Sequence, residues 1–73
     1  MGGMILNISQ KIGKNVHNRR KKLQMSQEEL AFHCQISTKY LGQIERGEAN
    51  PSIKVLDQIS NSLNTSISNL IKN

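Results

Sequence analysis

The chain has 73 residues, the length of one domain, and we expect no separate ligand-sensing domain, which would need about 50 or more further residues. Its formal charge is +5, and residues 1–24 carry six basic side chains and no acid. This asymmetry fits a polyanionic partner, but a solvated basic face produces the same pattern, so charge alone does not decide between the two.

Cysteine content and hydropathy indicate the compartment. Cys34 is the single cysteine, so no intramolecular disulfide can form, which fits a reducing cytosol. The apolar stretch over residues 4–8 is too short for a signal peptide, and no apolar run approaches the roughly 20 residues of a membrane span. We expect a cytoplasmic, nucleoid-associated protein with no membrane partner.

The first predicted helix follows an N-terminal tail. We expect residues 1–8 to form this tail, in part disordered, and residues 9–73 to form the domain. Ile12, Val16 and Leu23 recur on one helical face, which predicts a helix over 9–24 with Ser9 as its N-cap.

Two short helices come next, each with a clear start signal. Ser26 and Glu29 make a capping-box pattern that predicts a helix over 27–33. Ser37 is the next predicted N-cap, for a helix over 38–46, and Gly47 stands where a helix C-terminal glycine is common.

Two further helices complete an all-α domain. We expect helix four to start at Pro51, with Ser52 in its first turn, and to end at Asn64. Helix five is capped by Thr65 or Ser66. The predicted apolar stripe of helix four consists of Ile53, Leu56, Ile59 and Leu63, and the apolar positions of helix five are Ile67, Leu70 and Ile71. Those of helix five either close the core or form a two-fold interface, and we favour a mixture.

The helices over 27–33 and 38–46, joined by a tight turn, have the layout of a helix-turn-helix. Ala31 is a small residue where the two helices cross, and Leu41 and Ile44 face inward. The outward positions of the second helix are then Thr38, Lys39, Gly42 and Gln43. Gly42 either permits a close approach to DNA or is a tolerated surface position, and both interpretations stay open.

These motifs resemble the Cro/cI-type (XRE) helix-turn-helix family. The likeness spans about residues 11–70 and is carried by Ser-Gln-Glu-Glu-Leu-Ala at 26–31, Ile-Glu-Arg-Gly at 44–47 and Asn-Pro-Ser at 50–52. It implies a five-helix, lambda-repressor-like bundle that binds a palindromic double-stranded DNA operator as a homodimer, with helix 38–46 in the major groove. It thus implies a transcriptional repressor or activator, and residues 40–47 are similar to the controllers that accompany restriction-modification systems.

The resemblance also implies roles for individual residues. The base-reading or groove-facing positions are Ser37, Thr38, Lys39 and Gln43. Phosphate-contacting positions are Gln27, Arg46 and Asn50. To these we add Arg19, which widens the basic patch, and Tyr40, whose ring either stacks on the DNA backbone or packs against helix two. Arg20 and Glu45 match a structural salt bridge between helices one and three.

The chain departs from the family pattern at two positions. The family usually has glycine in the turn where this chain has Gln35, and a left-handed backbone there would cost about 1 kcal/mol. It usually has an apolar residue where this chain has Arg19. Neither departure changes the predicted fold.

Enzymatic function finds no support in the sequence. No nucleophile–base set, paired carboxylates or phosphate loop stands at useful spacing, and two histidines with one cysteine do not make a metal site. We expect no enzyme activity, no cofactor, no metal and no small-molecule ligand, with Cys34 as a small core residue. The alternative function is an antitoxin or another protein-interaction module on the same fold.

Overall fold

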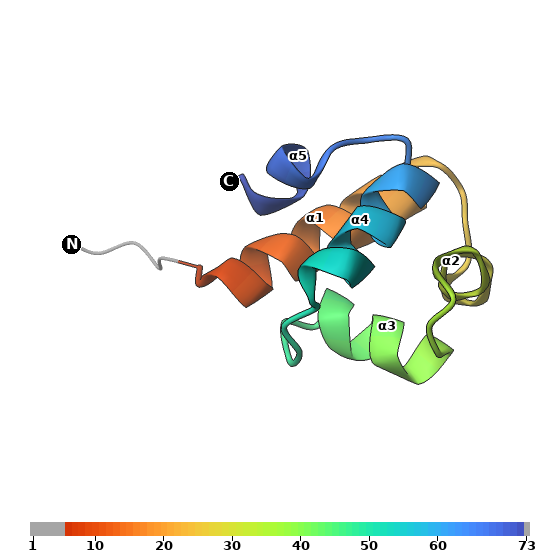
Figure 1. Cartoon of the computed structure of the whole chain (residues 1–73), viewed down its shortest axis with the longest axis horizontal. Helices are drawn as coiled ribbons and strands as arrows, with labels where there is room; N and C mark the ends of the chain where they lie inside the picture. Colours follow the sequence, from red (N-terminus) through yellow and green to blue (C-terminus); the bar gives the residue numbers. More distant parts are fainter. Residues whose placement is uncertain (1–5, 73) are drawn as a thin grey trace.

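Short polar side chains set the start of every helix. Each helix follows an Asn or Ser whose side-chain oxygen accepts the backbone N–H three residues further on. Over residues 6–72, which the computed structural model describes, the helices are α1 (Ile8–Lys22), α2 (Gln27–Cys34), α3 (Thr38–Glu45), α4 (Ile53–Ser62) and α5 (Ile67–Ile71), with no strand in that range (Figure 1). The predicted all-α, five-helix fold class is confirmed.

The start of α1 differs from the prediction. Its N-cap is Asn7 rather than Ser9, because Asn7 and Gln10 form a reciprocal capping box that satisfies both backbone N–H groups. Ile8, predicted as tail, is therefore helical. Residues 1–5, on which the predicted disorder falls, lie outside the described residues.

The later helix starts agree with the prediction more closely. Ser26 and Glu29 form the predicted capping box. Ser52 is the N-cap of α4 and not part of its first turn, because its hydroxyl accepts the N–H of Val55 from outside the helix; Pro51 precedes this cap. Of the two candidates for α5, Ser66 is the cap.

Four helices are followed, within two residues of their last helical residue, by a residue in the left-handed region. These residues are Gln24, Gln35, Gly47 and Asn64, with φ of 59°, 59°, 74° and 53°. In each case the N–H groups of this residue and of the next one bond back to carbonyl groups of the last helical turn. Gly47 and, to a lesser degree, Asn64 have residue types that this conformation favours, and Gln35 has the left-handed backbone considered above.

The core lies between the helices and is almost wholly aliphatic. Its buried residues are Ile12, Val16, Leu30, Ala31, Cys34, Leu41, Ile44, Leu56, Ile59, Leu63 and Leu70. The prediction was wrong for Leu23, which is 40% exposed, and for Ile53, which is 72% exposed. Leu23 is the C-cap of α1 and Ile53 is the first residue of α4, so both stand at the end of a helix. No helix in the described range is both long and apolar enough to cross a membrane.

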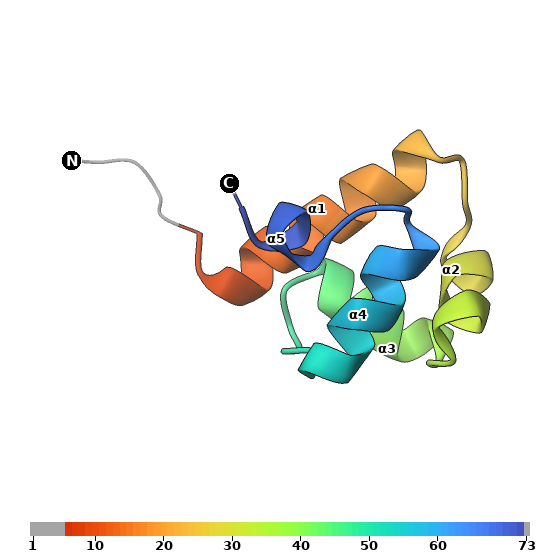
Figure 2. The ribbon, with the colours of Figure 1, turned by 45° about the horizontal axis from the view of Figure 1, so that its top comes forward.

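Helix α1 separates two sides of the molecule. It packs against α3 on one side and α5 on the other, while α2 packs on α3 and α4 (Figures 1 and 2). Gly13 faces α3 and Asn15 faces α5, which fits a separation of about 200° around the helix for two residues.

Gly13 determines how closely α1 and α3 approach. A Cβ at this position would lie 2.4 Å from the carbonyl oxygen of Ile44 and 2.7 Å from that of Glu45. Because both neighbours are backbone atoms at the C-terminal end of α3, no side chain fits here without moving one helix. Gly13 therefore fixes the position of α3 against the bundle.

Candidate nucleic-acid interface

The turn between α2 and α3 consists of three residues. Gln35 reverses the chain with its left-handed backbone, Ile36 packs against the core, and Ser37 caps α3. Ala31, 2% exposed, lies in the core beside this turn. The small residue and the short connection hold α3 across the end of α2, which is the arrangement of a helix-turn-helix.

Helix α3 has one buried and one open face. Leu41 and Ile44 are fully buried, whereas Ser37, Thr38 and Lys39 at its start are exposed. Half-buried Tyr40 and Gln43 complete the set of predicted contact residues on this helix. The exposed N-terminal turn presents free backbone N–H groups and a positive dipole end, which favour phosphate.

Gly42 does not belong to the open face. It is buried, and a Cβ there would meet the guanidinium nitrogen Nη1 of Arg46 at 3.0 Å. The prediction that Gly42 points outward is therefore wrong, because the Arg46 side chain covers it. The outward positions are Thr38, Lys39 and Gln43.

A buried ion pair joins α3 to α1. Arg20 donates from Nε to Glu45 Oε2 at 2.7 Å and from Nη2 to Glu45 Oε1 at 3.0 Å. Their side chains are only 7% and 4% exposed. Arg20 Nη1 also donates to the carbonyl oxygen of Met25 at 2.8 Å, so the guanidinium ties α3 to both α1 and the α1–α2 connection.

Two further side chains reach the same carboxylate. Gln27 donates from Nε2 to Glu45 Oε1 at 3.0 Å, and His17 Nδ1 lies 3.2 Å from that oxygen. Burial by itself raises the pKa of Glu45, but the hydrogen bonds from Arg20, Gln27 and His17 outweigh it and hold the pKa below its ordinary value of 4.5. The carboxyl group is therefore ionised at neutral pH.

Gln27, a predicted phosphate contact, is held at the start of α2. The hydrogen bond to Glu45 uses one amide hydrogen. As the first residue of the helix, Gln27 also has a backbone N–H with no partner within α2. Both this N–H and the second amide hydrogen can face a phosphate.

The loop after α3 carries two further predicted contacts. Arg46 pairs with Glu48 at 3.2 Å, and both side chains are more than half exposed, so this pair contributes little to stability. Asn50 is exposed, and its side-chain oxygen accepts a hydrogen bond from the Ser9 hydroxyl on α1. The start of α1 thereby anchors the loop beside α3.

Arg19 lies on another side of the molecule. Its Nε donates to the carbonyl oxygen of Leu63 and its Nη2 to that of Asn64, both at 3.0 Å. These contacts satisfy the C-terminal end of α4, where a cation is favourable. The structure therefore gives Arg19 a structural role away from α3, and the widened basic patch predicted from it is not found beside the helix-turn-helix.

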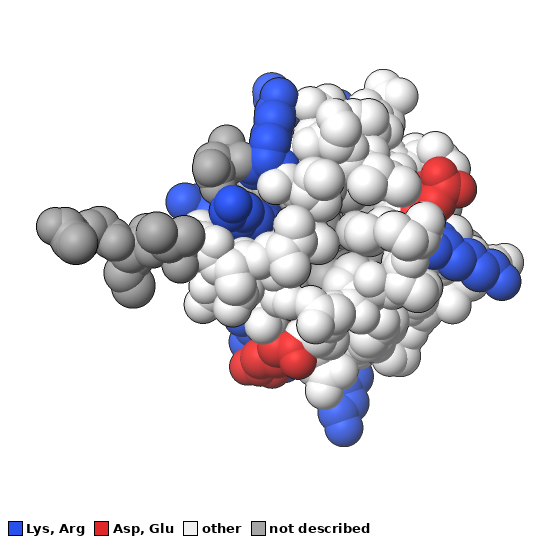
Figure 3. All heavy atoms as spheres, turned by 60° about the vertical axis from the view of Figure 1, so that its left-hand side comes forward, with Lys and Arg blue, Asp and Glu red and all other residues white. Residues whose placement is uncertain are grey.

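The basic excess of α1 is spread around the molecule. Arg20 is buried in its ion pair, while Lys11, Lys14 and Lys22 line hollows on the side of α1 that faces α5. In the view of Figure 3, basic side chains project at several separate places rather than in one patch. The cations beside the open face of α3 are instead Lys39 and Arg46.

Sequence reasoning missed the contributions of Gly13, His17 and Ser9. Glycine inside a helix costs about 1 kcal/mol, and this cost was the one available signal that Gly13 has a packing role. His17 and Ser9 gave no signal, because their partners lie 28 and 41 residues away in the chain.

Cys34 is part of the core and not of a reactive site. Burial raises the pKa of its thiol, which donates to the Ser62 hydroxyl at 3.5 Å. The described residues contain no group of three or more His, Cys, Asp or Glu side chains placed to hold a metal ion.

Two short helices at a tight turn, the second with an open N-terminal face, define a helix-turn-helix DNA-binding domain. The profile of the Helix-turn-helix family matches residues 16–70. The chain belongs to this family and is a sequence-specific DNA-binding transcriptional regulator.

Two curated relatives and one solved structure that the chain resembles are control proteins. The chain is 41% identical over 61 residues to Control protein C.BamHI from Bacillus amyloliquefaciens, covering 82% of this chain and 75% of that protein. It is 32% identical over 66 residues to Control protein C.SmaI from Serratia marcescens, covering 90% and 79%. The restriction-modification controller protein C.AhdI from Aeromonas hydrophila has a similar structure, with a TM-score of 0.81, 29% identity and coverage of 85% of this chain and 94% of that one.

Proposed function

We propose that this chain is a transcriptional controller of a restriction-modification system and that it places α3 in the major groove of a palindromic operator as a homodimer. The observation that carries the proposal is the exposed start of α3. Buried Leu41 and Ile44 pack the opposite face of this helix against the core, and the Arg20–Glu45 pair ties its end to α1. The likeness to control proteins supports the biological setting.

The proposed contacts follow from position and chemistry. The base-reading residues are Ser37, Thr38, Lys39 and Gln43, and the phosphate-contacting residues are Gln27, Tyr40, Arg46 and Asn50. A glutamine pairs with adenine N6 and N7 through two hydrogen bonds, and a lysine donates to guanine O6 and N7. Because the contacts of α3 leave the side chains of Lys39 and Gln43 available, these two residues are the proposed determinants of sequence.

A homodimer fits the symmetry of a palindrome. Two copies related by a two-fold axis would place their recognition helices about 34 Å apart, one turn of B-DNA. Leu70 fills the core of the single chain, whereas Ile71 on the same helix is 37% exposed. Ile71 is therefore the residue of α5 that we assign to the dimer contact. We propose further that the protein acts in the cytoplasm by binding alone and catalyses no reaction.

Selection of bound sequences from random duplex DNA tests the proposal. The expected result is an inverted repeat with half-sites about 10 base pairs apart. The selected site should also occur upstream of restriction or modification genes in the genome of origin. Binding that enriches no sequence and vanishes steeply as salt rises would contradict the proposal, because it would leave only charge-driven attraction.

Replacing Gln43 tests the assignment of α3 to the major groove. We expect Gln43→Ala to relax specificity at one position of each half-site, with a loss of about 1–3 kcal/mol on the preferred sequence. Gln58→Ala is the matched control, since Gln58 is also a half-buried glutamine but lies on α4. Affinity measured on a panel of single-base operator variants decides the result. An equal loss on every sequence would show that Gln43 does not read a base.

A further inference from the structure

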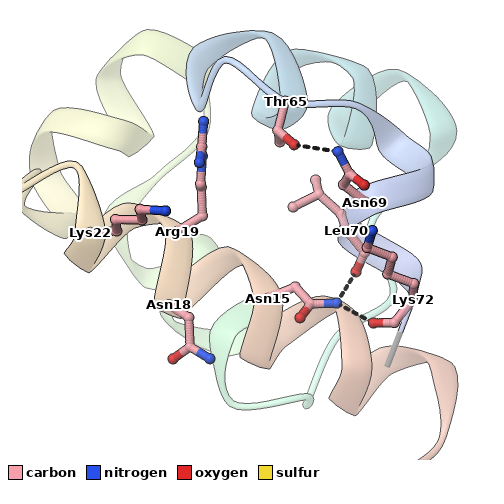
Figure 4. Close-up of a pocket in the computed structure, with 8 residues that line it drawn as sticks. All are labelled: Asn15, Asn18, Arg19, Lys22, Thr65, Asn69, Leu70 and Lys72. Carbon is pink, nitrogen blue, oxygen red and sulfur yellow. Dashed lines mark hydrogen bonds between the residues drawn. The ribbon is translucent and has the colours of Figure 1, made fainter.

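A cleft of about 390 Å³ lies between α1 and α5 (Figure 4). Its walls come from α1 on one side and from the α4–α5 connection and α5 on the other. The lining residues are Asn15, Asn18, Arg19, Lys22, Thr65, Asn69, Leu70 and Lys72. Three of these eight are cations and none is an acid. The volume falls within the range of about 300–1,000 Å³ typical of small-molecule sites.

Within residues 6–72, no acidic side chain neutralises the positive charge of this cleft. The five acids of the chain lie on α2, α3 and α4 and in the loop after α3, and none lines the cleft. Within residues 6–72, neither Lys22 nor Lys72 takes part in a salt bridge, and Arg19 Nη1 has no hydrogen-bond partner. A hollow lined by one sign of charge focuses the field and attracts anions.

Several lining groups are already fixed in place. Asn15 donates from Nδ2 to the carbonyl oxygens of Leu70 and Lys72 at 2.8 and 2.6 Å, and Asn69 donates to the Thr65 hydroxyl at 3.2 Å. The two hydrogen bonds of Arg19 to the end of α4 hold its guanidinium at the cleft wall. A site whose polar groups are anchored before binding loses less entropy when a ligand arrives.

The cleft is separate from the proposed DNA-contacting surface. Gly13 and Arg20 are among the residues of α1 that face α3. Asn15 and Lys22, two residues further along in each case, face the cleft. A duplex seated on α3 would therefore leave the cleft open. Its concave shape and its amide side chains suit a compact ligand better than a continuous nucleic-acid backbone.

We propose that this cleft binds a small anion with two or more linked phosphate groups. The guanidinium of Arg19 and the ammonium groups of Lys22 and Lys72 would share its charge, and Asn18 and Asn69 would donate further hydrogen bonds. Guanidinium and ammonium groups are the usual partners of phosphate oxygens. The proposal does not depend on the DNA-binding function, and its test contains no operator.

Titration of the ¹⁵N-labelled chain with sodium pyrophosphate, followed by nuclear magnetic resonance, tests the proposal. We expect saturable shifts concentrated on the side-chain amides of Asn18 and Asn69 and on the backbone amides around Lys22. The double variant Lys22→Gln/Lys72→Gln should weaken binding about tenfold, since it removes two of the three cations. Lys21→Gln is the matched control, because Lys21 is the neighbouring exposed lysine and does not line the cleft.

Three results of these titrations would overturn the proposal. Shifts that do not saturate and that spread over lysines all around the surface would show general charge attraction. An equal loss on Lys21→Gln and on the double variant would lead to the same conclusion. A parallel titration with a short duplex of random sequence separates the phosphate sources: cleft shifts with the duplex but none with pyrophosphate would assign the cleft to nucleic acid and refute a small-ligand site.

Discussion

At the scale of single residues, the carboxylate of Glu45 connects most of the proposed interface. Side chains from three positions converge on it, namely Arg20 and His17 from α1 and Gln27 from the start of α2. Glu45 itself lies at the C-terminal end of α3. One ionised group therefore sets the position of the recognition helix relative to both helices that support it.

Replacing Glu45 tests this role through stability. We expect Glu45→Gln to destabilise the protein by about 3 kcal/mol at pH 7, because it leaves the buried guanidinium of Arg20 without its counter-charge. The pKa of Glu45 is lowered on folding, so its contribution is complete above the ordinary value of 4.5 and is lost as pH falls through the folded value. Urea unfolding at several pH values measures the free energy of unfolding. The difference in this free energy between wild type and Glu45→Gln should shrink below pH 4.5.

An exposed pair provides the control for this experiment. Glu48 pairs with Arg46 at 3.2 Å, but both side chains are more than half exposed. Glu48→Gln should change the free energy of unfolding by less than about 1 kcal/mol. Similar losses from the two variants would show that the Glu45 cluster does not hold α3 in place.

At the scale of secondary-structure elements, the helix ends use one geometry with different residues. Gln24, Gln35, Gly47 and Asn64 all adopt a left-handed backbone. Position 47 also leaves no space for a side chain, because a Cβ there would lie 3.0 Å from Cγ of Gln10 and 3.2 Å from its Cα. The side chain of Gln35 is exposed, so the free-energy cost of having glutamine rather than glycine at this position comes from the left-handed backbone alone.

The turn between α2 and α3 can therefore be stabilised. We expect Gln35→Gly to raise the free energy of unfolding by about 0.5–1 kcal/mol, since glycine adopts the left-handed region without a steric penalty. Gln35→Ala is the control: it removes the same side chain but keeps the penalty, so no gain is expected. Thermal unfolding of both variants measures the effect, and equal midpoints would show that the turn stores no strain.

At the scale of the whole molecule, the surface retains several large apolar side chains. Among residues 6–72, the exposed large apolar side chains are Ile8, Leu23, Phe32, Ile53 and Ile71. Single exposed apolar residues are common on protein surfaces and do not by themselves identify an interface. A two-fold contact through α5 is one way to cover Ile71, and it predicts which substitution separates the subunits.

The proposed dimer makes a direct prediction. We expect the wild-type chain to sediment as a dimer and Ile71→Glu to sediment as a monomer at the same concentration, because a charge buried in an apolar interface is costly. Phe32→Glu is the control, since Phe32 is 80% exposed and lies on α2. Circular dichroism verifies that both variants remain folded. A monomer produced by Phe32→Glu and not by Ile71→Glu would place the interface on α2 instead.

The sequence by itself determined the number of helices and most of their starts. Capping is decided within four residues, so Ser26 with Glu29 and the isolated Ser37 could be recognised without any tertiary information. The inward face of each helix followed from its periodicity for the same local reason. The prediction from periodicity was wrong at Leu23 and Ile53, which are exposed. Both lie at helix ends, where periodicity does not indicate which element covers a side chain.

Only the tertiary structure decided how distant residues meet. It paired Arg19 with carbonyl groups 44 and 45 residues away and brought Gln27 onto Glu45 across 18 residues. It also directed Lys11, Lys14 and Lys22 of α1 toward α5 rather than α3. The physical reason is that these outcomes depend on the distance and orientation between packed helices, which a pattern along one helix does not contain.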